Sequence, residues 1–112
     1  MDNNYTPDRW VVIEFSDNGE KTRKVLAGWI GGYAKADTWR MNSGITEVKD
    51  EGDFFLFSGY SGSVYKCWKQ SEGMTSLSAD IYESFLKQVQ ESAGEYTLEM
   101  ITPFRIDNAE ST

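Results

Sequence analysis

Histidine is absent from the 112-residue sequence, which also has only one cysteine and two prolines. Without histidine the chain cannot form a Ser-His-Asp triad or a Cys-His pair, and it offers no imidazole ligand to a metal. A single cysteine excludes an internal disulfide and a cysteine-based zinc site. The sequence therefore lacks the residues of many catalytic and metal centres, and we expect a non-enzymatic protein with no metal and no cofactor.

Long apolar runs and a basic charge balance are also missing. No uninterrupted apolar stretch is longer than the four residues of Phe54–Phe57, far short of the roughly 20 residues that span a membrane. Eighteen acidic and 11 basic residues give a net charge of −7, which disfavours binding along a phosphate backbone. The polar N-terminus lacks the pattern of a secretory signal. We expect a cytoplasmic protein that contacts neither membrane nor nucleic acid directly.

Residues 9–16 and 21–30 are predicted to form an antiparallel hairpin with Asn18-Gly19 at its tip. A type I′ turn needs positive φ at both central positions, and Asn-Gly supplies it. The resulting register pairs Glu14 with Arg23, two opposite charges. At the end away from the turn, both faces of the hairpin are apolar. That end is therefore either buried on both sides or part of an interface.

Short strands are predicted next, at 38–42, 45–49, 53–58 and 63–69. Lys49 is expected opposite Asp53, with a pairing to Phe54 as the alternative if the connecting loop is one residue shorter. A four-residue loop at 59–62 places Phe54 beside Cys67. These registers depend on loop lengths that the sequence leaves open.

Residues 76–93 are predicted to form a helix, because their apolar residues recur on one stripe. Ser76 or Ser78 is expected to cap its start and Gly94 its end; a last strand follows at 96–102. The predicted fold class is α+β: one antiparallel sheet of five or six strands packed against a single C-terminal helix, with a strand after the helix. Residues 1–8 are expected to form a loose arm, 9–105 the domain and 106–112 a polar tail.

Aromatic and basic residues supply the candidate binding site. Large rings and cations dominate binding energy when a partner encloses them, and they also stack on nucleotide bases. Cys67 is interpreted as a small buried residue rather than a nucleophile, because no histidine can activate it. The segment from Trp29 to Arg40 is expected to form the main contact surface. The full set of candidates is Trp29, Tyr33, Trp39, Arg40, Tyr60, Lys66 and Lys69.

Several ordered motifs resemble a group of small uncharacterised proteins encoded by tailed bacteriophages. They are the segments 9–13, 24–33, 37–45, 62–67 and 73–75, which include a Trp-x-Gly-Gly-Tyr, a Trp-Arg-x-Asn-Ser-Gly-Ile and a Gly-Ser-x-Tyr-Lys-Cys pattern. The resemblance covers roughly residues 9 to 90 and carries no agreed activity, so it transfers no catalytic residue. It implies expression in the cytoplasm of an infected bacterium.

Two functional hypotheses follow. In the first, the protein binds and inhibits a host protein or a component of an anti-phage defence system, as small acidic phage proteins often do; this step is an analogy. In the second, an aromatic and basic pocket binds a nucleotide signal, within one chain or across a homodimer. An inhibitor should present a flat or convex patch with charge at its rim, whereas a nucleotide binder should present an enclosed pocket.

Overall fold

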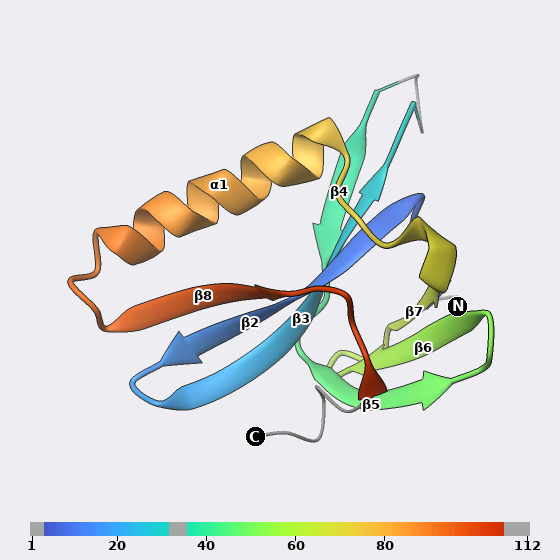
Figure 1. Ribbon diagram of the computed structural model, residues 1–112, viewed down its shortest axis with the longest axis horizontal. Coiled ribbons are helices and arrows are strands. Elements are labelled where there is room, and N and C mark those ends of the chain that lie inside the picture. The colour runs from blue at the N-terminus through green and yellow to red at the C-terminus, as the bar shows by residue number, and fades with distance from the viewer. Residues whose placement is uncertain (1–3, 32–35, 107–112) are drawn as a thin grey trace.

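The computed structural model describes residues 4–31 and 36–106 (Figure 1). Within these residues the protein has eight strands and one α-helix, and the last of the eight strands follows the helix. This confirms the α+β class. The elements are β1 (Asn4–Tyr5), β2 (Arg9–Asp17), β3 (Glu20–Trp29), β4 (Thr38–Met41), β5 (Ile45–Asp50), β6 (Phe54–Gly59), β7 (Val64–Trp68), α1 (Ser76–Gln90) and β8 (Tyr96–Ile101).

The strands form two four-stranded sheets rather than the single sheet of five or six strands that we expected. Sheet 1 has the order β1-β7-β6-β5, and sheet 2 has the order β4-β3-β2-β8. All pairings are antiparallel except that of β1 with β7, which is parallel. The division follows from the apolar residues on both faces of β2 and β3. The helix can cover one face of these strands, and a second sheet is needed to cover the other.

The predicted hairpin is confirmed, including its register. β2 pairs with β3 so that Glu14 lies opposite Arg23, and the Arg23 Nε donates to Glu14 Oε2 at 2.9 Å. Asn18 and Gly19 both have positive φ, 51° and 91°, as a type I′ turn requires.

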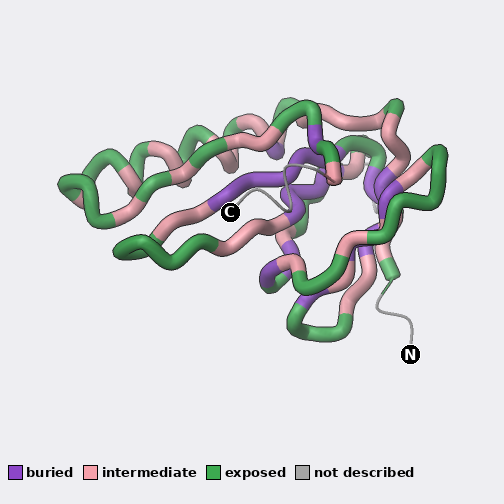
Figure 2. The backbone as a smooth tube through the Cα atoms, turned by 60° about the horizontal axis from the view of Figure 1, so that its bottom comes forward, coloured by how far each residue is buried: buried purple, intermediate pink, exposed green. Residues whose placement is uncertain are grey.

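The end of the hairpin away from the turn is buried on both sides, so the first of the two expected alternatives holds. Val11, Ile13 and Leu26 face α1 and pack with its side chains. The opposite face packs against sheet 1 and forms the larger core cluster, which consists of Trp10, Val12, Val25, Ala27, Phe55, Phe57, Tyr65, Cys67 and Phe104. Figure 2 shows this buried centre and the exposed hairpin tip. The order of layers is therefore α1, sheet 2, sheet 1.

The predicted registers of β5, β6 and β7 are wrong. Lys49 lies opposite Leu56, not Asp53 or Phe54. Cys67 lies opposite Phe55, not Phe54. The loop between β6 and β7 is one residue shorter than expected, because Gly62 adopts a φ of +90° and the N–H of Gly59 donates to Ser63 O. A left-handed residue closing a three-residue loop is a common hairpin geometry.

Both ends of α1 differ from the expectation. The N-cap is Thr75 rather than Ser76 or Ser78. Its hydroxyl accepts from the Ser78 N–H at 3.0 Å, and the Ser78 hydroxyl accepts from the Thr75 N–H at 2.9 Å. This reciprocal capping box satisfies two otherwise free donors. The helix ends at Gln90 rather than residue 93 and its C-cap is Glu91, so Gly94 lies beyond the cap.

The described parts of the expected arm and tail lie against the domain. Asn4 and Tyr5 pair with β7, and Tyr5 packs on the larger core cluster. At the other end, Ile106 also packs on that cluster. The ordered fold therefore extends further toward both termini than residues 9–105.

Candidate functional site

The two tryptophans of the expected contact surface lie against other elements of the fold. Trp29 donates its indole N–H to Thr6 O at 3.0 Å and meets the Tyr5 ring edge-on at 6.3 Å between centroids. Trp39 is 38% exposed and meets the ring of Phe85 on α1 at 6.1 Å. Both rings therefore help to hold the N-terminal strand and the helix in place.

Arg40 takes part in an aromatic cluster on the side of sheet 2 that faces sheet 1. Its guanidinium carbon lies 4.6 Å from the centroid of the Tyr5 ring, and the Tyr5 and Tyr65 rings are 5.0 Å apart. Burial raises the pKa of Tyr65 to about 12, although the positive charge of Arg40 acts in the opposite direction. Tyr65 is therefore a neutral phenol at physiological pH.

Tyr60 and Lys69 lie apart from this aromatic cluster and from each other. Tyr60 is 75% exposed, in the loop between β6 and β7. Lys69 Nζ contacts Asp50 Oδ1 at 2.7 Å and lies 4.7 Å from the Phe55 ring centroid. The hydrogen bond from Lys69 lowers the pKa of Asp50. Tyr33 lies outside the described residues.

The described candidates are thus spread over several surfaces and do not enclose one pocket. Trp29 and Arg40 lie near β1, Trp39 lies against α1, and Tyr60, Lys66 and Lys69 belong to sheet 1 and its loops. Within residues 4–31 and 36–106, one cleft is lined by Tyr60 together with Lys21 and Arg23, and two others include Lys69. The nucleotide hypothesis therefore stays a prediction.

Lys66 identifies a different surface, on the outer face of sheet 1. Its Nζ lies 4.5 Å from the centroid of Phe54 and 4.6 Å from that of Trp68, and these two rings meet edge-on at 5.0 Å. Phe54 pairs with Trp68, and the same face continues through Leu56, Lys66 and Val64. We call Phe54, Leu56, Val64, Lys66 and Trp68 the outer-sheet patch.

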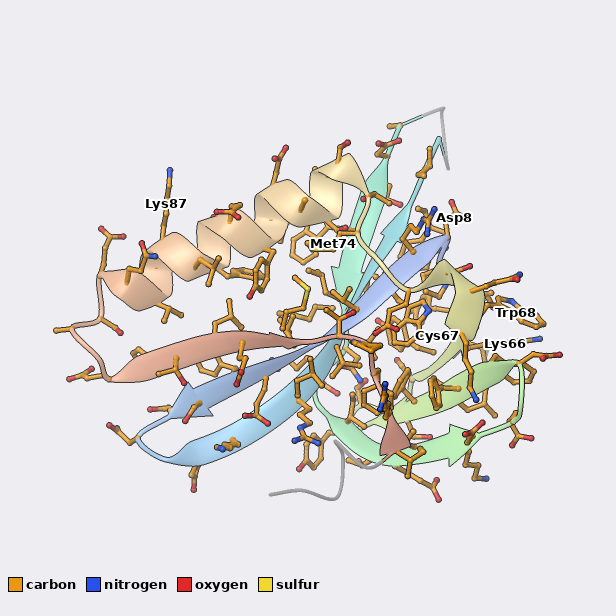
Figure 3. All side chains as sticks on the ribbon, in the orientation of Figure 1. Asp8, Lys66, Cys67, Trp68, Met74 and Lys87 are labelled. Carbon is orange, nitrogen blue, oxygen red and sulfur yellow. The ribbon has the colours of Figure 1, made fainter. Side chains whose placement is uncertain are left out.

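The outer-sheet patch is not part of the core. Its four apolar side chains are partly exposed, and none belongs to or packs against either core cluster. In Figure 3 Lys66 and Trp68 lie at the periphery beside β6 and β7. Two exposed residues of the neighbouring strand β5 lie beside it, namely Glu47 and Lys49. An apolar centre with charged neighbours is the usual composition of a protein-binding surface.

The sequence interpretation missed Phe54 and Trp68 because of the register error. Side chains alternate between the two faces of a strand, so a shift of one residue exchanges the faces. Placing Phe54 beside Cys67 assigned Phe54 to the buried face. The signal that could have corrected it is Gly62, since a three-residue loop ending in glycine pairs Phe54 with Trp68.

Cys67 is fully buried, in agreement with the interpretation of this residue as a small core side chain. Burial raises the pKa of its thiol, which favours the protonated form over the reactive thiolate. Among the described residues, no group of three or more acidic or cysteine side chains is placed to hold a metal ion.

The chain matches no protein-family model, no curated protein and no solved structure. No helix in the described part of the chain is long and apolar enough to cross a membrane.

Proposed function

We propose that the protein is a small phage-encoded accessory protein that binds and inhibits a host protein or a component of a bacterial anti-phage defence system. It acts in the cytoplasm of the infected bacterium and catalyses no reaction. The phage context comes from the sequence resemblance described above. The structural support is the outer-sheet patch, an apolar and aromatic surface that neither the helix nor the other sheet covers.

The chemistry of the patch favours a protein partner. Phe54 and Trp68 form a rigid aromatic centre, a residue class that dominates interface energies once water is excluded. Lys66 supplies a cation directly over both rings, on a protein whose net charge is −7. The complementary partner surface has an apolar knob or pocket beside an acidic group.

The proposal is tested by capturing the tagged protein from infected bacteria, identifying the partner by mass spectrometry and measuring its affinity for purified variants. We expect Trp68→Ala to weaken that affinity at least about 30-fold, the loss of roughly 2 kcal/mol typical of an interface anchor. Lys66→Glu should weaken it by charge repulsion, with little effect on the melting temperature.

Leu86→Ala is the matched control, because Leu86 is a partly exposed apolar residue of α1 that belongs to neither core cluster and lies outside the patch. It should bind like the wild type and support the same inhibition. If Trp68→Ala and Lys66→Glu remain folded and bind as tightly as Leu86→Ala, the patch is not the interface and the proposal fails.

A further inference from the structure

A groove of about 450 Å³ lies between the C-terminal half of α1 and the side of sheet 2 that faces it. Strands β2, β4 and β8 and helix α1 line it with apolar side chains. The apolar side chains are Ile13, Phe15, Met41, Phe85, Val89 and Leu98. Cavities of a few hundred cubic ångströms with a largely apolar lining are typical small-molecule sites.

The helix covers sheet 2 incompletely, which is why the groove exists. Ser78 is the only buried residue of α1. Ile81 and Tyr82, nearer the start of the helix, pack on the core cluster that faces α1. Beyond them, Phe85 and Val89 remain partly exposed above the strands. Apolar surface left in contact with water costs about 25 cal/mol per Å², so the groove favours an occupant with an apolar body.

Lys24 gives the groove a single cation. It lies opposite Ile13 on β3, it is half-buried, and it lines the groove. Among the described residues, none forms an ion pair or a side-chain hydrogen bond with Lys24. An ammonium group beside apolar surface binds an anionic group more strongly than one in water does.

Glu91, an acidic residue, also lines the groove. It directly follows α1, where the negative end of the helix dipole adds to its charge, whereas Lys24 lies on β3. An anionic group is therefore disfavoured at Glu91 and favoured at Lys24. The two charges orient an elongated occupant along the groove.

We propose that this groove binds a small amphipathic molecule with an apolar chain and one carboxylate, with the carboxylate at Lys24. The volume corresponds to about 15 water molecules, which suits a ligand of roughly ten non-hydrogen atoms, as in a medium-chain fatty acid. The groove and the outer-sheet patch lie on opposite sides of sheet 2, so this site is independent of the proposed function.

The test is calorimetric titration of the full chain with octanoate and with 1-octanol, its uncharged counterpart. We expect octanoate to bind one site and 1-octanol to bind the same site more weakly. Lys24→Met retains a long apolar side chain and removes the charge. It should weaken octanoate binding about tenfold, the size of one charge-assisted contact, and leave 1-octanol binding within about twofold.

Lys87→Met is the matched control, because Lys87 lies on the outward side of α1 (Figure 3) and should leave both affinities unchanged. Val89→Trp fills the groove with a ring and should abolish binding of both compounds. The inference is overturned if neither compound binds, if Lys24→Met and Lys87→Met behave alike, or if a folded Val89→Trp variant still binds octanoate.

Discussion

The indole N–H of Trp10 donates a hydrogen bond to the backbone carbonyl of Trp68 at 2.7 Å. Trp10 belongs to β2 in sheet 2 and Trp68 to β7 in sheet 1, so this bond joins the two sheets directly. The Trp10 ring is fully buried, and it contacts Phe55, Phe57 and Phe104 within one aromatic cluster. Trp10 therefore anchors the interface between the sheets, while the side chain of Trp68 lies on the outer face.

Trp10→Phe should lower the free energy of unfolding by about 2–3 kcal/mol, because it removes a hydrogen bond, leaves the Trp68 carbonyl without this donor and opens a cavity. Trp39→Phe is the control, since Trp39 is 38% exposed, and it should cost less than about 1 kcal/mol. Urea denaturation followed by circular dichroism measures both values. Equal losses in the two variants would contradict the anchoring role of Trp10.

Gly28→Ala should destabilise the protein by about 1–3 kcal/mol through overpacking. A Cβ at Gly28 would lie 2.8 Å from Thr75 Oγ1 and 2.9 Å from Thr75 Cγ2, at the point where the start of α1 meets β3. Thr75→Ala alone should cost about 1 kcal/mol or more, because it removes the N-cap.

The two changes form a double-mutant cycle that isolates this contact. In the Thr75→Ala background, Gly28→Ala should cost less than it does in the wild type, because the colliding atoms are gone. Additive losses, measured by the same denaturation experiment, would show that the space at Gly28 is not limited by Thr75.

Stability should fall as the pH rises from about 10 to about 12, with Tyr65 as one contributor. The pKa of Tyr65 is raised from 10.0 to about 12, chiefly by burial. The unfolded chain therefore loses this proton first, so the contribution of Tyr65 is complete below pH 10 and is lost as the pH rises through the folded-state pKa. The gap between the two values corresponds to at most about 2–3 kcal/mol.

The measurement is a series of denaturation curves between pH 9 and pH 12 for the wild type and for Tyr65→Phe. The Phe variant keeps the buried ring and has no phenol to ionise, so its stability should decline less steeply with pH. Tyr60→Phe, at a 75% exposed position, should follow the wild type. Parallel curves for all three proteins would exclude Tyr65 as the cause.

Cys67→Ser should leave partner binding intact and lower stability by about 1–3 kcal/mol, because a buried hydroxyl without a good partner is costly. Cys67→Ala tests the packing contribution separately. Affinity and melting temperature are measured on the same preparations. Loss of binding at an unchanged melting temperature would show that the thiol has a direct functional role.

Local signals in the sequence were sufficient for the hairpin and the helix. Asn18-Gly19 determined where β2 turns back, and the opposite charges of Glu14 and Arg23 agree with the register that this turn imposes. The apolar residues on both faces of β2 and β3 indicated either burial on both sides or an interface, and the structure shows burial. The periodic stripe through Ile81 and Phe85 identified the helix. Each of these features depends on residues close together in the chain.

The division into two sheets, the faces of β6 and the positions of the binding surfaces were decided only by the tertiary structure. The loop that ends at Gly62 is one residue shorter than expected, and this difference exchanges the expected buried and exposed faces of β6. Phe54 therefore lies in the outer-sheet patch rather than in the core. Trp39 lies against Phe85 because of how α1 crosses sheet 2, and Lys24 faces a groove for the same reason. Contacts between residues far apart in the chain depend on how whole elements pack against each other. The local pattern of residues does not determine that packing.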